Sequence, residues 1–115
     1  MKEFNIPQSE SEFSCEVTKG EPFVLIMNGN MSTGYCWYLK SENYEQKIKP
    51  LNLDKHNTAS EYKTNPHPEG YVGVPGKWYF RFEPIESGQI DLDFSYEQAW
   101  RPGHGYNTKV HITIN

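Results

Sequence analysis

The chain has 115 residues and a formal net charge of −4, with hydrophobic residues at 36% and aromatic residues at 15%. This length predicts one domain over residues 1–115, with a core in which Trp, Tyr and Phe supply much of the volume. The negative charge argues against nucleic acid and anionic membranes as partners. No hydrophobic stretch approaches the length of a membrane span. The first ten residues lack the apolar segment of a secretory signal, so we expect a cytoplasmic protein.

Short segments in which apolar and polar residues alternate run along most of the chain, and such alternation predicts strands with one buried face. The segments are 13–17, 35–39, 77–82, 90–96 and 109–114, together with a continuous apolar run at 23–27. Residues 40–72 are less regular, and we expect one further strand there, with a helical turn or a strand at 44–53. An antiparallel β-sandwich of about seven or eight strands is the most economical architecture.

Three segments do not fit this alternation, and each is rich in Gly, Pro or Asn at the end of an expected strand. They are residues 28–34, 69–76 and 98–105, named here loop 1, loop 2 and loop 3. The loops of a sandwich cluster at its two ends, so all three loops could share one end.

The two cysteines, Cys15 and Cys36, are too few for a disulfide framework, which favours reduced thiols. Cys36 lies inside an expected strand with no adjacent base, so a cysteine-dependent enzyme is disfavoured. Such an enzyme would lose its activity on Cys36→Ser. The four histidines show no HxH or HxxxH spacing, and we expect neither a metal site nor a cofactor.

Exposed aromatic residues raise a second hypothesis. Trp100 lies in loop 3 with Tyr106 nearby, and aromatic platforms of this kind bind carbohydrates or peptides. A β-sandwich binding module of that class predicts that Trp100 is needed for binding and that Thr33 is not.

Loop 1 carries the sequence N-M-S-T-G-Y at residues 30–35, followed by Trp37. It resembles the N-P-T-T-G-[YF]-x-W motif of the chagasin-type (family I42) inhibitors of papain-like cysteine proteases, the amoebal type included. The departures are Met31 and Ser32, which stand in place of the proline and the first threonine.

Loop 2 is similar to the second motif of that family, G-x-G-G. Gly73 and Gly76 match, and Pro75 stands in place of the middle glycine. Motifs in the family order, each at a strand boundary, extend the resemblance from about residue 13 to the C-terminus. The family fold is an immunoglobulin-like β-sandwich, which agrees with the alternation along the chain.

Loop 3 resembles the third motif, Arg-Pro-aromatic, in which the aromatic residue follows a tyrosine by four positions. Trp100 follows Tyr96 by four, with Gln and Ala at 98–99 in place of Arg-Pro. This register needs no insertion in the strand 90–96. In the other register Arg and Pro at 101–102 match, but Gly103 follows where an aromatic residue is expected.

The resemblance implies a reversible, tight-binding inhibitor rather than an enzyme, with its three loops in the active-site cleft of cathepsin L- or B-type proteases. Loop 1 would lie over the catalytic Cys-His pair, with loops 2 and 3 on either side. A small polar apex suits a narrow cleft, and we expect a monomer in the free state. The residues expected to bind the protease are Asn30, Met31, Ser32, Thr33, Gly34, Tyr35, Gly73, Val74, Pro75, Gly76, Trp100, Arg101 and Pro102.

Overall fold

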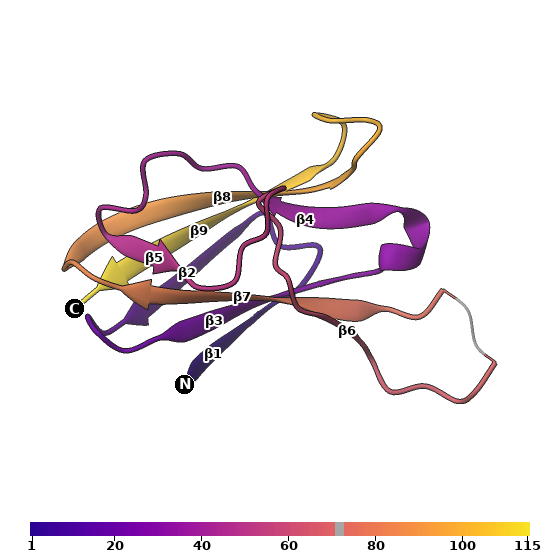
Figure 1. Ribbon diagram of the computed structural model, residues 1–115, viewed down its shortest axis with the longest axis horizontal. Helices are drawn as coiled ribbons and strands as arrows, with labels where there is room; N and C mark the ends of the chain where they lie inside the picture. The colour runs from indigo at the N-terminus through magenta and orange to yellow at the C-terminus, as the bar shows by residue number, and fades with distance from the viewer. Residues whose placement is uncertain (71–72) are drawn as a thin grey trace.

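The computed structural model describes residues 1–70 and 73–115, which form two β-sheets packed face to face (Figure 1). The strands within the described residues are β1 Lys2–Ile6, β2 Glu12–Val17, β3 Phe23–Gly29, β4 Tyr35–Leu39, β5 Ile48–Pro50, β6 Tyr62–Thr64, β7 Gly76–Pro84, β8 Gly88–Gln98 and β9 Tyr106–Ile114. One 3-10 turn, η1 Met31–Thr33, lies between β3 and β4. None of the described residues form a helix long and apolar enough to cross a membrane.

The two sheets are mixed. Sheet A has the order β1-β3-β7, with β5 and β6 both paired to the far side of β7, and sheet B has the order β2-β9-β8-β4. The all-β sandwich is confirmed, but β1 pairs with β3 and β2 pairs with β9 in parallel. Parallel neighbours cannot be joined by a hairpin. The expectation of antiparallel pairing throughout failed because the chain crosses from sheet A to sheet B at residues 7–11, so each parallel pair joins distant parts of the sequence.

Two regions gave weak sequence signals. Strand β1 was not predicted, and of its five residues only Ile6 is buried, so alternation could not reveal it. Among its described residues, the irregular segment 40–72 contains two strands, β5 and β6, and β5 lies within the region 44–53 where a strand or a helical turn was expected. It also contains the expected turn, in which the amides of Lys47 and Ile48 both donate to the carbonyl of Tyr44 at 3.1 Å.

Aromatic side chains fill the space between the sheets, as the composition predicts. Phe80 of sheet A and Phe94 of sheet B meet edge to face, with ring centroids 5.0 Å apart, a favoured arrangement for aromatic pairs. The largest side chains of the core, none more than 1% exposed, are Trp37, Trp78, Phe23, Phe80, Phe82 and Phe94.

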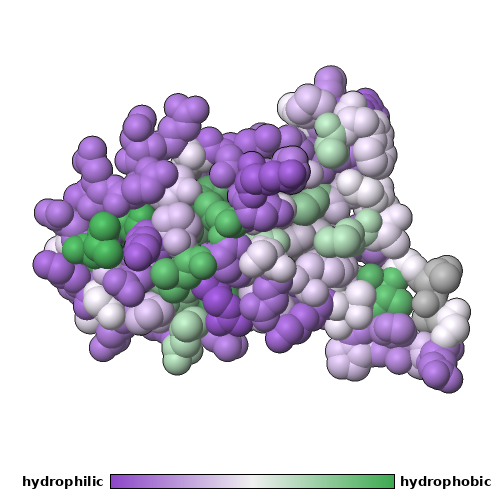
Figure 2. All heavy atoms as spheres, viewed as in Figure 1, coloured by the Kyte–Doolittle hydropathy of each residue, from purple (hydrophilic) through white to green (hydrophobic). Residues whose placement is uncertain are grey.

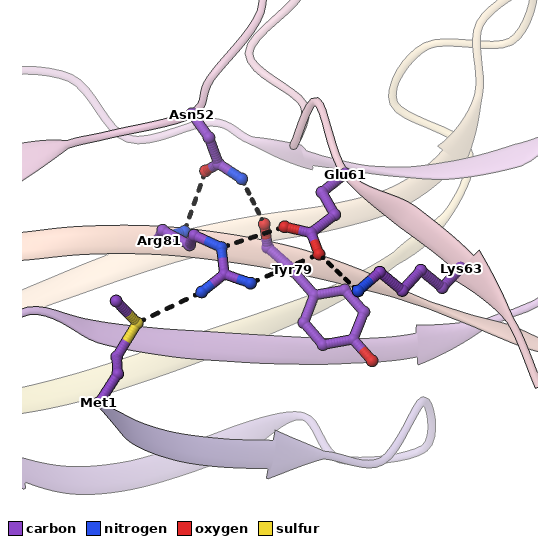
Figure 3. A network of polar contacts seen from close by, with 6 residues as sticks. All are labelled: Met1, Asn52, Glu61, Lys63, Tyr79 and Arg81. Atoms are coloured by element: carbon purple, nitrogen blue, oxygen red, sulfur yellow. Dashed lines mark hydrogen bonds and ion pairs between the residues drawn. The ribbon is translucent and has the colours of Figure 1, made fainter.

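A polar cluster on the outer face of sheet A positions β6 (Figure 3). Strands β5 and β6 pair with opposite ends of β7, and the Asn52 side chain bridges the gap between them. Its amide nitrogen donates to the carbonyl of Tyr79 at 2.7 Å, and its oxygen accepts from the amide of Arg81 at 3.0 Å. Glu61 pairs with Arg81 and Lys63, each at 3.0 Å, and these contacts hold the pKa of its carboxyl below the usual range. The cluster therefore fixes the strand that leads into loop 2.

Candidate functional site

Loops 1, 2 and 3 lie at one end of the sandwich, and the two termini lie toward the other end (Figure 1). Loop 1 joins β3 to β4, loop 2 leads into β7, and loop 3 joins β8 to β9. In Figure 1 the 3-10 turn of loop 1 lies between the β8–β9 hairpin above it and loop 2 below it. Residues 71–72 of loop 2 lie outside the described residues.

The residues that begin and end the 3-10 turn give loop 1 its shape. Asn30 is extended, with φ −142° and ψ 104°, and its side-chain oxygen accepts from the amide of Ser32 at 3.0 Å. This is the capping role for which asparagine is suited. Gly34 ends the turn in the left-handed region at φ 83°, and its amide donates to the carbonyl of Met31 at 2.9 Å. Glycine adopts this conformation without steric cost.

Asn30 also joins loop 1 to loop 2 and to the core. Its side-chain nitrogen donates to the carbonyl of Gly73 at 2.7 Å. Its amide donates to the hydroxyl of Tyr96 at 2.7 Å, and its carbonyl accepts from the Thr33 hydroxyl at 2.8 Å. Tyr96 is only 2% exposed, so the loop is anchored to a rigid part of the sandwich. We call this set of hydrogen bonds the Asn30 hub.

Loop 3 contacts loop 1 through Trp100 and Gln98. The Trp100 ring lies so close to Gly34 that a Cβ there would collide with it. The side-chain nitrogen of Gln98 donates to the carbonyl of Thr33 at 3.0 Å. Strand β8 pairs with β9 without interruption up to Tyr96, which favours the register in which Trp100 is the matched aromatic residue. Gln98, at the arginine position of that register, therefore holds loop 1 in place.

The predicted contact residues differ in exposure. Trp100 is 67% exposed and Met31 is 43% exposed, so both offer apolar surface to a partner. Asn30, Gly34, Tyr35 and Val74 are half-buried. The remaining exposed members of the set are Ser32, Thr33, Gly73, Pro75, Arg101 and Pro102.

Gly76 is an exception, because it is buried at the start of β7. A Cβ at this position would collide with the Tyr62 ring and with the backbone carbonyl of Lys63. The missing side chain therefore serves the packing of β6 on β7, and Gly76 offers no surface to a partner. Gly73 is exposed with φ 69° and is the motif glycine that the turn itself requires.

The apex of loop 1 is uncharged, and its backbone amides are internally bonded. The amides of Ser32, Thr33 and Gly34 donate to Asn30 or Met31 within the loop. The three loops together contain one carboxylate, Glu69, and one guanidinium, Arg101. In Figure 2 the loop end is accordingly paler than the rest of this face, where strongly hydrophilic residues dominate.

Glu97, next to loop 3 at the end of β8, is 4% exposed and bonds to loop 3 through the amide of Gly103. Its carboxylate pairs with Lys40 at 2.6 Å and accepts from the Ser95 hydroxyl at 2.7 Å and the Gly103 amide at 3.3 Å. Burial alone raises the pKa of this carboxyl, but the hydrogen bonds more than offset it and hold the pKa below the usual range.

The cysteine-dependent enzyme is not supported by the surroundings of Cys36. Burial raises the pKa of the Cys36 thiol, and its polar neighbour is the Thr58 hydroxyl at 3.1 Å. A thiol with a raised pKa is a poor nucleophile at neutral pH. Both cysteines are free, and burial raises the pKa of Cys15 to about 11. Within residues 1–70 and 73–115, no group of three or more His, Cys, Asp or Glu side chains could hold a metal ion.

Sequence reasoning missed the roles of three residues that hold loop 1: Tyr62, Tyr96 and Gln98. The hydroxyl of Tyr62 accepts from the amide of Met31 at 3.4 Å, a weaker counterpart of the Tyr96 contact. Tyr96 was identified as a core residue of its strand and as the motif tyrosine before Trp100, but not as a hydrogen-bond partner of loop 1. A buried tyrosine hydroxyl needs a hydrogen-bond partner, and the position of Tyr96 near the end of β8, two residues before loop 3, was the available signal.

Comparison with protein families and sequences identifies relatives of the chain. The family model described as Chagasin family peptidase inhibitor I42 matches residues 16–114. Amoebiasin-1 of Entamoeba histolytica is 22% identical over 98 residues, which cover 85% of this chain and 85% of that protein. Amoebiasin-2 of the same organism is 24% identical over 98 residues, which cover 85% of this chain and 72% of that protein.

Solved structures share the fold. The cysteine protease inhibitor EhICP2 from Entamoeba histolytica matches with a TM-score of 0.73 and 19% identity, covering 99% of this chain and 96% of that one. PbICP-C, solved in complex with falcipain-2, matches with a TM-score of 0.66 and 16% identity over 100% of both chains. These structures confirm the immunoglobulin-like sandwich expected from the resemblance.

Proposed function

The chain belongs to the chagasin family of peptidase inhibitors, and we propose that it blocks the active-site cleft of papain-like cysteine proteases with loops 1, 2 and 3. It is an inhibitor and not an enzyme, and the carbohydrate- or peptide-binding module is not favoured. One observation carries the proposal. The Asn30 hub joins loop 1 to loop 2 and to the core, while Trp100 packs on Gly34. The three loops therefore form one wedge.

Loop 1 has the properties needed beside a thiolate–imidazolium pair. Apart from Met31, its apex has small side chains, and it carries no charge, so it can enter a narrow cleft without bringing an unpaired charge out of water. A peptide bond is attacked only when its carbonyl carbon is aligned with the nucleophile. The 3-10 turn, closed by the bond from Gly34 to Met31, would have to open first. Loop 1 therefore binds as an inhibitor and is not turned over.

Because the three loops are already ordered in the free protein, the entropic cost of binding is low. Loops that are already hydrogen-bonded in the free protein lose little freedom when they dock. Met31 in loop 1 and Trp100 in loop 3 offer exposed apolar surface, and large exposed aromatic residues are typical binding hot spots. Reversible, tight binding follows from this combination of rigidity and apolar surface.

Inhibition assays on papain and on cathepsins L and B test the proposal. A double variant, Thr33→Asp with Trp100→Ala, places a charge on the apex and removes the main apolar contact. We expect stoichiometric inhibition by the wild-type protein and a loss of at least about a hundredfold in affinity for the variant. Ile85→Ala, at an exposed apolar residue outside the loops, is the matched control and should inhibit like wild type. Failure of the wild-type protein to inhibit any papain-like protease would contradict the proposal.

We also propose that the protein is a cytoplasmic monomer when free, with cathepsin L- or B-type proteases as targets. The free cysteines, one of them half-buried, suit a reducing compartment. Cell fractionation and sedimentation test this directly. Recovery of the protein only from vesicles or the medium, or as a stable dimer, would contradict it.

A further inference from the structure

Tyr106 lies on the inner face of sheet B but is not covered by sheet A. It is paired with Tyr96 in the β8–β9 ladder, and directly opposed residues point to the same face of a sheet. Tyr96 is 2% exposed, whereas Tyr106 is 62% exposed. Sheet A covers Tyr96 through Trp78, but β2 pairs with β9 only from Lys109 onward, so Tyr106 lies at a corner of sheet B beyond the end of β2. The inner face of sheet B is therefore open at this corner, and we call the exposed face of Tyr106 the Tyr106 ledge.

The exposed ring of Tyr106 ends a row of aromatic side chains that starts in the core. Trp78 meets Tyr96 edge to face at 6.0 Å. Tyr35 stacks on Tyr96 with ring centroids 5.0 Å apart, and the Tyr106 ring lies 6.4 Å from that of Tyr35. Tyr106 is thus held at a defined place by packed neighbours and has little freedom to lose on binding.

A small hollow of about 190 Å³ separates this ledge from loop 1. It is lined by Gln8, Asn30, Thr33, Tyr35, Tyr96 and Tyr106. No member of this set is charged at neutral pH, and the hydroxyl and amide groups lie among aromatic rings. Such a lining favours an uncharged group, because a charged one would lose its hydration without finding a counter-ion.

We propose that the Tyr106 ledge is a fourth contact surface of the wedge, and that it receives an uncharged, largely apolar side chain from the rim of the protease cleft. The proposal rests on the proposed function, and the ledge is continuous with the wedge because Thr33 and Asn30 belong to both. When loop 1 enters the cleft, the flank that carries Tyr106 is brought against the rim. A large, rigid and exposed aromatic ring in that position is a typical hot spot.

Inhibition of papain by single variants tests the ledge. We expect Tyr106→Ala to weaken inhibition at least about tenfold and Tyr106→Phe to change it by less than about threefold, because the ring supplies most of the contact. Leu51→Ala is the matched control, since Leu51 is 44% exposed on the body of the sandwich. It should leave inhibition unchanged. Thermal unfolding of each variant verifies the fold. A folded Tyr106→Ala that inhibits like wild type overturns the ledge proposal.

Footprinting with short pulses of hydroxyl radicals supplies a second test. We expect the oxidation of Tyr106 to fall in the complex with papain, while Leu51 is oxidised equally in the free protein and in the complex. Equal oxidation of Tyr106 in both states overturns the ledge proposal while leaving cleft blocking by the three loops intact. If the wild-type protein inhibits no papain-like protease, the proposed function fails first and the ledge proposal fails with it.

Discussion

The Asn30 hub and the polar cluster on sheet A formed by Asn52, Glu61, Lys63 and Arg81, which we call the Arg81 cluster, both tie together segments that are distant in sequence, but they use different chemistry. At the hub, amides, hydroxyls and carbonyls bond to one another with no ionised group. On the outer face of sheet A, Arg81 and Lys63 pair with Glu61 beside the Asn52 amide (Figure 3). Both sets of contacts order the chain, yet only the neutral set lies at the surface proposed to meet the protease.

The difference follows from the solvent that each region meets. The Arg81 cluster stays in water, where charged groups cost little to keep and their pairs contribute modestly. The hub lies beneath a surface that is dehydrated when a partner binds, and neutral hydrogen bonds tolerate dehydration better than ion pairs do. We therefore expect changes at the hub to reduce affinity, and changes at the Arg81 cluster to reduce stability alone.

The largest expected effect is on Asn30. Asn30→Ala removes the bond to Gly73 and both bonds that Ser32 makes to the side-chain oxygen, so loop 1 loses its shape and its link to loop 2. We expect about a hundredfold weaker inhibition of papain, from a few bonds of about 1 kcal/mol each. Asn30→Asp keeps the two acceptor contacts and loses the donor to Gly73. We expect the affinity of Asn30→Asp for papain to lie between those of Asn30→Ala and wild type. Equal inhibition by all three proteins would show that the hub does not order the wedge.

Tyr96→Phe sharpens the comparison, because it removes one hydroxyl from the core without touching the surface. The Asn30 amide loses its acceptor at 2.7 Å, and a donor left without a partner costs about 1–3 kcal/mol. We expect about tenfold weaker inhibition together with a lower melting temperature. Tyr44→Phe, at another buried tyrosine, is the control and should not change affinity. If the Tyr96→Phe protein is destabilised but inhibits fully, the hydrogen bond from Asn30 to Tyr96 contributes to stability and is not needed for inhibition.

Asn52→Ala tests the other side of the comparison. The substitution leaves the amide of Arg81 and the carbonyl of Tyr79 without their partner in the gap between β5 and β6. We expect the free energy of unfolding to fall by about 1–3 kcal/mol, measured by urea denaturation. The inhibition constant at 25 °C should stay within about twofold of wild type. A large loss of affinity in the folded variant would mean that β6 transmits disorder to loop 2.

The smallest expected effect is a dependence on pH through Glu97. The pKa of this carboxyl is lower in the folded protein than its ordinary value of 4.5, so its stabilisation is present above that value and is lost as pH falls through the folded pKa. The difference in melting temperature between wild type and Glu97→Gln should therefore shrink from about pH 6 to about pH 3. A difference that grows on acidification would contradict this assignment.

The sequence predicted much of the fold because the buried faces follow simple alternation, as in β7, where every second residue from Gly76 to Pro84 is buried. The strands it missed or left vague, β1, β5 and β6, are short or largely exposed. They are stabilised by pairing with strands distant in the sequence, and this pairing cannot be predicted from a local pattern of apolar and polar residues.

For the candidate site, motif spacing indicated which loops matter but not how they are held together. The motif marks Asn30, but its side-chain bond to Gly73 depends on β6 and β7 bringing loop 2 alongside loop 1. Gly76 matched a motif but is buried beneath Tyr62. Gln98 departed from the motif but bonds loop 1. In each case the outcome depended on a neighbour across the fold, which is not adjacent in the sequence.

The three tryptophans divide between two environments, and intrinsic fluorescence can therefore report on two processes. Trp37 and Trp78 are 0% and 1% exposed, whereas Trp100 is 67% exposed. Buried indoles emit at shorter wavelengths than indoles in water. Docking of a partner on Trp100 should shift only the long-wavelength part of the spectrum, and unfolding should shift only the short-wavelength part. One unlabelled sample could thus follow complex formation and loss of the core separately.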